Sequence, residues 1–269
     1  MSLIPNFATL GSGPTVLMLH DADTDHLAFA PQVELLASQG YRAIAWDMPG
    51  YRGNPPPYAG YSLAALASTA DRLLDVLKIT RAHIVGHGVG AMIAAEMALR
   101  HPTRVRSLTM VAGGPALDTE SQEHWVGTRK RLLAEAQQHA DTEAAQLAWF
   151  AEQLVQLQAG QKALPEGLQL TRHAITQVQP LAYGRILDML AHSDKLAARL
   201  PHLTQRTLLV SGAQDVCMPP QHMQALADVL PQAKHHSLPG TGHWPQLENT
   251  EDFEALLLDF LASLHAPLH

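Results

Sequence analysis

Apolar residues recur along the chain in short continuous runs, separated by stretches with helical periodicity. Runs that are apolar at nearly every position are typical of strands covered on both faces, as in parallel sheets. The runs predicted as strands are Pro14–His20, Tyr41–Trp46, Ile84–Val85, Val105–Ala112, Thr207–Ser211 and Ala233–Leu238.

The stretches between these runs carry helix signals. Gly40 closes the first predicted helix, and Ser62 is a good N-cap for the second. The predicted helices are Phe29–Gln39, Leu63–Leu77, a small-residue helix that ends near Arg100, Pro220–Leu230 and a last one from about Thr250 to Leu264. Alternating strands and helices predict an α/β fold, a mostly parallel sheet with helices on both faces.

The amino-acid composition changes between about Ala116 and Leu200, where glutamine, alanine and leucine dominate. Trp125, Trp149 and Phe150 fall at helical spacings, and no run resembles a strand. We expect a helical segment, broken by Gly160 and by Pro165–Gly167. The expected division is a core of residues 1–117 and 201–269 and an inserted cap of residues 118–200, with the aromatic residues in the cap core or the pocket wall.

Composition narrows the class of protein. The chain has 269 residues, of which 46% are hydrophobic and 16% charged, which suits one large domain with an insertion. The net charge of −7 comes without a basic block, so we expect neither nucleic acid nor a membrane as partner. One cysteine, no signal-peptide pattern in Met1–Gly13 and no membrane-length apolar run predict a cytoplasmic protein.

A glycine-dense corner marks the first candidate site. After the predicted strand at Ile84–Val85, Gly86, Gly88 and Gly90 lead into the small-residue helix. Strand, sharp turn and helix are the layout of a nucleophile elbow, Gly-x-Ser-x-Gly, whose middle residue sits at the helix N-terminus. That middle residue is Gly88, which has no side chain. A purely structural corner would give the same pattern.

Further reactive residues follow other predicted strands, at the sheet edge where α/β proteins bind ligands. Together with Gly88, the residues at such ends are His20, Asp47, Asp215 and His243.

The order of these pieces resembles the α/β-hydrolase family over essentially the whole chain. The elbow is followed by Gly212–Asp215, which resembles the acid loop of the family, and then by Gly242–His243, which resembles its base loop. Asp47–Gly50 resembles the Asp-x-Pro-Gly turn of the family. The resemblance implies a site that needs no cofactor.

The resemblance also implies roles. His243 would exchange protons with the reacting groups, and Asp215 would fix its tautomer. The oxyanion hole would use the backbone N–H groups of Val89 and Ala22. Asp21 stands where the family has glycine, and a carboxylate facing the hole would oppose a developing negative charge. We therefore expect Asp21 to point away.

Three interpretations of Gly88 remain open. The chain is a serine enzyme inactivated at its nucleophile, or the Asp215–His243 pair activates a water in the place of the serine side chain. The alternative is a non-catalytic protein that binds a small molecule on the same fold. The predicted function is hydrolysis of a small organic ester, lactone, amide or activated carbon–carbon bond. The sequence leaves the substrate-binding residues and the oligomeric state open.

Other reactive side chains receive simpler interpretations. The loop from Asp21 to His26 is rich in possible ligands, but its spacing matches neither the calcium-loop nor the zinc patterns, so no metal is expected. His87 is expected to shape the elbow. Cys217 is expected to pack beside the acid loop rather than to act as a nucleophile.

Overall fold

A computed structural model describes residues 4–57, 60–115, 119–192 and 195–264. Within these residues the strands form one sheet of seven, and β1 is the only antiparallel member. In spatial order the strands are β1 (Phe7–Leu10), β3 (Arg42–Trp46), β2 (Thr15–Leu19), β4 (Ala82–His87), β5 (Val105–Val111), β6 (Thr207–Gly212) and β7 (Ala233–Leu238). The predicted α/β class with a mostly parallel sheet is confirmed.

The central strands are apolar at consecutive positions because both faces of the sheet are covered. In β2, Val16 and Met18 belong to the hydrophobic cluster on one face, whereas Leu17 and Leu19 belong to the cluster on the other. All four side chains have no exposed surface. Successive side chains of a strand point to opposite faces, so two covered faces require an unbroken apolar run.

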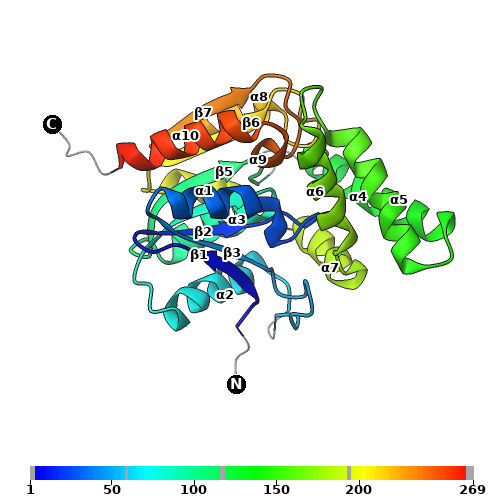
Figure 1. Ribbon diagram of the computed structural model, residues 1–269, viewed down its shortest axis with the longest axis horizontal. Coiled ribbons are helices and arrows are strands. Elements are labelled where there is room, and N and C mark those ends of the chain that lie inside the picture. The colour runs from blue at the N-terminus through cyan, green and yellow to red at the C-terminus, as the bar shows by residue number, and fades with distance from the viewer. Residues whose placement is uncertain (1–3, 58–59, 116–118, 193–194, 265–269) are drawn as a thin grey trace.

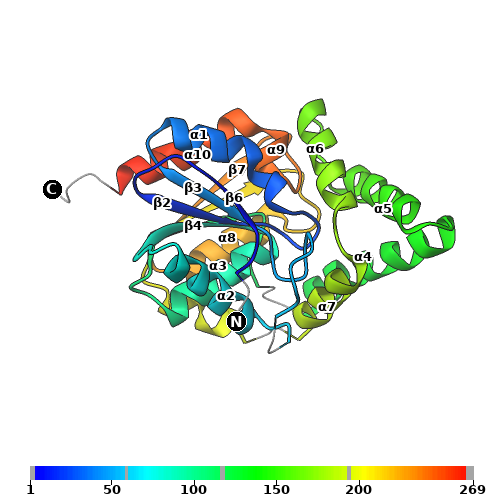
Figure 2. The same ribbon diagram turned by 60° about the horizontal axis from the view of Figure 1, so that its bottom comes forward.

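Helices cover both faces of the sheet, as predicted. Figures 1 and 2 show α1 (Ala30–Ser38) and α10 (Thr250–Ser263) on one side, and α2 (Leu63–Val76) and α3 (Val89–Arg100) on the other. The shorter helices α8 (Pro220–Val229) and α9 (Pro245–Glu248) follow β6 and β7. None of the helices in the described part of the chain is long and apolar enough to cross a membrane.

Between β5 and β6 the described chain is helical. Its helices gather at one end of the molecule in Figures 1 and 2 and are α4 (Thr119–His139), α5 (Glu143–Gln158), α6 (Pro165–Thr176) and α7 (Pro180–Leu190), followed by the short 3-10 helix η2 (Ala197–His202). Residue 118, the expected start of the insertion, lies outside the described residues.

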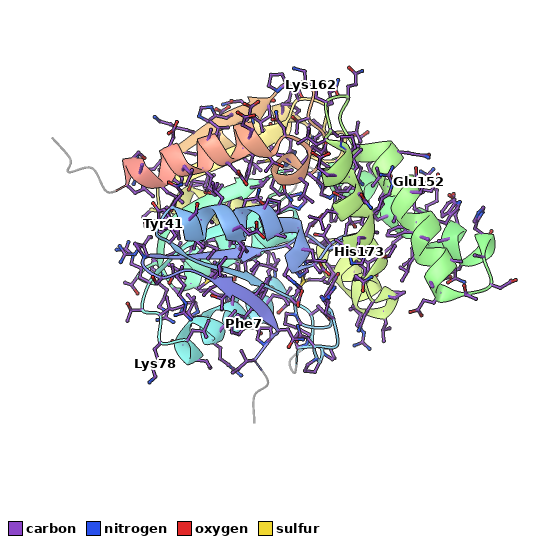
Figure 3. The ribbon with its side chains drawn as sticks, viewed as in Figure 1. Phe7, Tyr41, Lys78, Glu152, Lys162 and His173 are labelled. Atoms are coloured by element: carbon purple, nitrogen blue, oxygen red, sulfur yellow. The ribbon has the colours of Figure 1, made fainter. Side chains whose placement is uncertain are left out.

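Polar contacts join the inserted helices to one another and to the core. For example, the loop after α5 meets the loop after β7, where the Lys162 N–H donates to the carbonyl of Gly240 at 2.9 Å. Glu152 on α5 pairs with Arg172 on α6 at 2.7 Å. Figure 3 labels Lys162 and Glu152 at these two places.

One predicted helix break is wrong. Pro165–Gly167 does not interrupt the helices but begins α6, where Pro165 occupies the first turn and needs no N–H partner. Gly167 serves packing, because a Cβ there would lie 1.9 Å from the carbonyl oxygen of Leu247. The glycine therefore lets α6 approach α9 closely.

Strand β1 was not predicted from the sequence. Its four residues are half-buried or exposed, and they pair antiparallel with β3 at the edge of the sheet, Phe7 opposite Trp46. A short edge strand needs no continuous apolar run, so it lacks the signal that identifies the central strands.

The close contact between α3 and β2 gives a test of the fold. A Cβ on Gly90 would lie 2.0 Å from the carbonyl oxygen of Leu19. We expect Gly90→Ala to lower the free energy of unfolding by about 1–3 kcal/mol or more, because the helix must shift away from the sheet. Urea denaturation measures this loss.

Gly184 in α7 is the matched control, because nothing lies within 4 Å of an added Cβ. Gly184→Ala is expected to be neutral or to stabilise the protein by up to about 1 kcal/mol. Equal losses in the two variants would show that helix α3 does not depend on the close contact.

Candidate active site

The predicted sharp turn at the end of β4 is present. Gly88 has φ +54° and ψ −119°, a conformation that disfavours larger residues, and helix α3 begins at Val89. A Cβ on Gly86 would lie 2.3 Å from the carbonyl oxygen of Gly90. The two outer glycines therefore let strand and helix meet closely, and the middle one takes the strained backbone angles.

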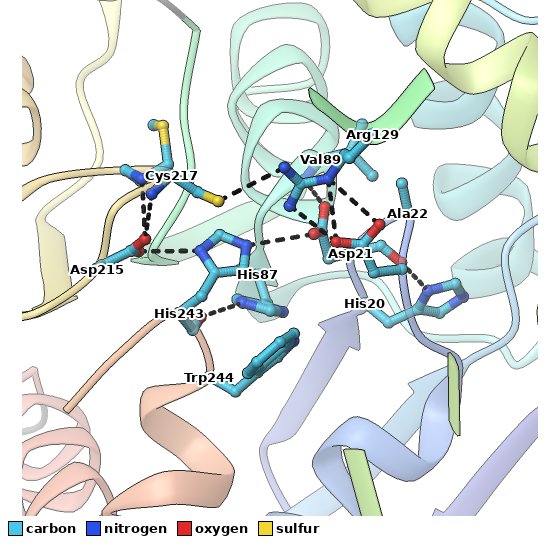
Figure 4. Close-up of polar contacts among 12 residues, drawn as sticks. His20, Asp21, Ala22, His87, Val89, Arg129, Asp215, Cys217, His243 and Trp244 are labelled. Carbon is cyan, nitrogen blue, oxygen red and sulfur yellow. Dashed lines mark hydrogen bonds and ion pairs between the residues drawn. The ribbon is translucent and has the colours of Figure 1, made fainter. Parts of the chain in front are cut away.

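The Asp21 carboxylate occupies the space above Gly88. A Cβ built on Gly88 would lie 2.0 Å from both Cγ and Oδ1 of Asp21. The backbone N–H of Val89 donates a hydrogen bond of 2.6 Å to Oδ1 (Figure 4). The expectation that Asp21 points away is wrong. The N-terminus of α3 and the imidazole of His243 attract the carboxylate inward.

This placement also bears on one of the three interpretations of Gly88, in which a water takes the place of the serine side chain. A water in place of the serine side chain would need the Val89 N–H and the room above Gly88, and Asp21 takes both. The carboxylate, rather than solvent, fills the gap left by the missing nucleophile.

His243 and Asp215 meet as the order of the loops predicts. Asp215 follows β6, His243 follows β7, and Nδ1 of His243 lies 2.9 Å from Oδ2 of Asp215. Asp215 is oriented by the backbone N–H groups of Cys217 and Met218, which donate to Oδ1 at 2.8 and 3.0 Å.

The other imidazole nitrogen of His243 faces Asp21. Nε2 lies 3.5 Å from Oδ2 of Asp21, and the side chains of His243, Asp21 and Asp215 have no exposed surface. Figure 4 shows the imidazole between the two carboxylates. The result is a buried row of carboxylate, imidazole and carboxylate beside the elbow.

The two carboxylates set the charge of His243. Burial alone would lower the pKa of His243, but Asp215 and Asp21 oppose this and raise it well above 6.5. Burial alone would likewise raise the pKa of Asp21, but His243, His87 and Arg129 hold it far below the usual range. The pKa of Asp215 is lowered in the same way by His243. At neutral pH the row is therefore an imidazolium between two anions.

His87 supports the loop that carries His243. Its Nε2–H donates to the carbonyl of His243 at 2.8 Å. Burial, followed by the charge of His243, lowers the pKa of His87 to about 4, so this ring is neutral. This contact fits the expected role of His87 in shaping the elbow.

The first residues after β2 are fixed from the opposite side. His20 accepts a hydrogen bond from the Met48 N–H at 2.8 Å and donates from Nδ1 to the carbonyl of Asp21 at 2.7 Å. Ala22, the second predicted oxyanion-hole residue, is buried, and its carbonyl accepts from the Tyr51 hydroxyl at 2.8 Å. The Val89 N–H, the first predicted donor, is committed to Asp21.

Two important residues come from the inserted helices and were missed in the sequence. Arg129 of α4 and Asp23 form an ion pair at 2.8 Å, and neither side chain has any exposed surface. The Tyr183 hydroxyl of α7 donates to the same carboxylate. Helical periodicity places Arg129 and Tyr183 on helices but gives no sign of this distant partner. Asp23 thus connects the loop after β2 to two of the inserted helices.

Among the residues that the structure describes, three clusters bring possible metal-ligating atoms within 4.8 Å of one another: Asp21, Asp23 and His243; Asp215, Cys217 and His243; and Asp25, His26 and Asp47. The first shares Asp23 with Arg129 and Tyr183, and the second contains the Asp215–His243 pair. In the third, Asp25 is paired with Arg52 at 2.7 Å. Each cluster has members that already hold a protein partner.

The remaining predicted residues pack as side chains of the inserted helices or loops. Phe150 is fully buried, and Trp125 and Trp149 pack partly buried against the same cluster. The Arg129 guanidinium lies 4.2 Å from the centre of the Trp125 ring. Burial raises the pKa of the Cys217 thiol, which keeps it protonated and poorly nucleophilic.

Removal of Arg129 would leave the Asp23 charge buried without its ion-pair partner. We expect Arg129→Met to lower the free energy of unfolding by about 3–5 kcal/mol, and Asp23→Asn in the same chain to recover part of the loss. Urea denaturation compares the variants. Arg131→Met removes an exposed pair with Glu135 on the same helix and should cost about 1 kcal/mol or less. Equal effects at the two arginines would contradict the buried pair.

The charge of His243 is open to direct measurement. Nitrogen chemical shifts of the imidazole should report a doubly protonated ring at neutral pH. Asp21→Asn should lower the pKa of His243, because one of the two anions that favour the cation is gone. The raised pKa stabilises the fold fully below pH 6.5, and this contribution is lost as pH rises through the folded value. If the pKa of His243 were unchanged in Asp21→Asn, Asp21 would not interact with the imidazole.

Several known proteins resemble this chain in sequence or in fold. The chain is 31% identical to the 2-hydroxymuconate semialdehyde hydrolase of Pseudomonas sp. (strain CF600) over 268 residues, 97% of this chain and 91% of that relative. An esterase of Thermogutta terrifontis has a similar fold, with a TM-score of 0.83, 22% identity and coverage of 97% and 94%. The enol-lactonase of Burkholderia xenovorans LB400 matches with a TM-score of 0.82, 22% identity and coverage of 96% of both chains.

A family model for the alpha/beta hydrolase fold matches residues 14–250. This match spans the elbow, the acid loop and the base loop, and it covers most of the chain. The chain belongs to the α/β-hydrolase fold family.

Proposed function

We propose that the protein hydrolyses a small organic substrate. The bond that it cleaves is an ester, lactone, amide or activated carbon–carbon bond. The observation that carries the proposal is the buried Asp215–His243 pair, held at 2.9 Å beside the elbow. A protein that only binds a ligand has no need of an imidazole with its tautomer fixed by a carboxylate. The hydrolase and enol-lactonase names among its relatives support the same class of reaction.

The reaction proceeds without a serine intermediate, because Gly88 offers no nucleophile. His243 is the group that can move protons, since Asp215 orients its ring and balances its charge. The protonated ring donates to a leaving group, and the neutral ring accepts a proton from water. The Val89 N–H is not free for the substrate while Asp21 holds it.

The inserted helices would act as a cap over this site, dividing the chain into a core of residues 1–117 and 201–269 and a cap of residues 118–200. Arg129 and Tyr183 support this role, because both reach from the helices to Asp23 beside the site. The side chains of Asp21, Asp215 and His243 have no exposed surface, so a cap of this kind would have to move before a substrate could reach them.

Hydrolysis of short-chain aryl esters and lactones tests the proposal. His243→Ala should lower kcat/KM by about 100- to 10,000-fold, because proton transfer is lost. Asp215→Asn should act in the same direction by misplacing the tautomer. Where the neutral ring acts as base, the rate should rise with pH beyond 6.5, because the pKa of His243 is raised well above that value.

His173→Ala is the matched control, because this histidine lies exposed on α6 (Figure 3) and should leave the rate unchanged. Hydrolysis that survives His243→Ala would contradict the assignment. Tight binding of the same compounds without any turnover would favour a non-catalytic binding protein.

Restoring a serine tests whether the site is an inactivated serine enzyme. Gly88→Ser alone should not react with a fluorophosphonate, because its Cβ would lie 2.0 Å from the Asp21 carboxyl carbon. Gly88→Ser with Asp21→Gly removes the clash and frees the Val89 N–H for an oxyanion. This double variant should be labelled and should show a burst of ester hydrolysis.

Asp21→Gly alone is the control, and it should not be labelled because it has no hydroxyl at position 88. Labelling of Gly88→Ser as fast as the double variant would show that Asp21 does not block the elbow.

A further inference from the structure

The two oxygens of Asp21 have different surroundings. Oδ1 accepts the 2.6 Å hydrogen bond from Val89. Among the described residues, Oδ2 has no hydrogen-bond partner, although it is buried and aimed at Nε2 of His243 at 3.5 Å. Nε2 of His243 is likewise without a hydrogen bond in the described part of the chain. The proposed function gives Asp21 no role, and its free oxygen faces the group that moves protons.

We propose that Asp21 is itself a nucleophile, and that Oδ2 forms an ester with a saturated carbon of the substrate that carries a leaving oxygen. The inference rests on the proposed function for the proton transfers of His243 and Asp215, and it names a different substrate class, of which an epoxide is the simplest member. Carboxylates serve as nucleophiles elsewhere in enzymes, and this one fills the space that a serine side chain would occupy.

The Val89 N–H is already hydrogen-bonded to Asp21, and this favours a substrate attacked at an alkyl carbon over one attacked at an acyl carbon. Attack on an acyl carbon develops negative charge on the carbonyl oxygen of the substrate, which needs a hydrogen-bond donor. Oδ1 of Asp21 already holds the Val89 N–H. Displacement at a saturated carbon creates no such oxyanion, so the occupied donor is no obstacle.

The first step balances with the groups present. Oδ2 attacks the saturated carbon and forms a C–O bond, while the bond from that carbon to the leaving oxygen breaks. His243, protonated between Asp21 and Asp215, gives its Nε2 proton to the leaving oxygen. The products are an alkyl ester on Asp21, an alcohol and a neutral imidazole.

The second step uses the Val89 N–H. Neutral His243 takes a proton from a water, which attacks Cγ of Asp21, and the charge develops on Oδ1, 2.6 Å from the amide nitrogen of Val89. The tetrahedral carbon then expels the alkoxide, which recovers the proton from His243. The carboxylate is regenerated with one oxygen from water, and the net reaction is hydrolysis.

The groups around His243 suit this sequence. Asp215 and Asp21 face its two ring nitrogens, and the neutral His87 and the thiol of Cys217 lie nearby. Two anions favour the imidazolium that donates in the first step. Conversion of Asp21 to a neutral ester removes one anion, which favours the neutral imidazole needed in the second step.

The test uses the full-length protein with propylene oxide and styrene oxide in water enriched in heavy oxygen. Over several turnovers, mass spectrometry of the peptide that contains Asp21 should find heavy oxygen in this carboxylate. His243→Gln should instead accumulate a covalent adduct of the epoxide on Asp21. The strained ring still opens, more slowly and with a proton from water, whereas the base of the second step is missing. Thermal melting checks that each variant is folded.

Two double variants locate the adduct. His243→Gln with Asp21→Asn should form none, whereas His243→Gln with Asp25→Asn should still form it, because Asp25 caps the short helix at His26 and does not face His243. Heavy oxygen that enters only the product, or turnover that survives Asp21→Asn, would overturn the inference. So would a folded protein that opens neither epoxide.

These outcomes separate the inference from the proposed function. Ester hydrolysis that depends on His243, with an unlabelled Asp21 and no reaction of epoxides, would leave the proposed function standing and remove the inference. Labelling of Asp21 by epoxides without hydrolysis of esters or lactones would support the inference and contradict the substrate class of the proposed function.

Discussion

The site depends on one buried carboxylate, that of Asp21. Moving a carboxylate out of water costs several kcal/mol even after relaxation, so it needs hydrogen-bond donors or groups of opposite charge as partners. The Val89 N–H at the start of α3 supplies one, and the imidazolium of His243 supplies the other. His243 in turn carries its charge because Asp215 lies on its far side. Removal of any member changes the protonation of the others.

The two departures from the family pattern are parts of one arrangement. A side chain at position 88 would collide with Asp21, and only a glycine there leaves room for the carboxylate. The Val89 N–H, which would otherwise have no partner above the elbow, is satisfied by that same carboxylate. A simple exchange of serine for glycine would leave a void, whereas here the void is filled by a charged group with suitable partners. Gly88 and Asp21 therefore depend on each other in the geometry of the elbow.

The sequence predicted what depends on local pattern. Continuous apolar runs identified the central strands, and the order of loops brought Asp215 to His243. The direction of Asp21 could not be predicted, because it depends on empty space above Gly88, far away in the chain. The contacts of Arg129 and Tyr183 with Asp23 could not be predicted for a similar reason, since helical spacing specifies the buried face of a helix but not its partner. At Pro165 the residue type allowed either a break or a helix start, and in the structure it begins α6.

Asp21 and Asp23 lie two residues apart on one loop, and each carboxylate is fully buried with its own partners. Asp21 is held by the elbow and His243, while Asp23 is held by Arg129 and Tyr183 from α4 and α7. Movement of these helices away from the loop would leave the Asp23 carboxylate buried without its partners, unless water entered at the same time. If the inserted helices act as the proposed cap, opening of the site would therefore be coupled to its hydration. The side chains of Asp215, His243 and Asp21 have no exposed surface, and this burial strengthens the electrostatic contacts among them.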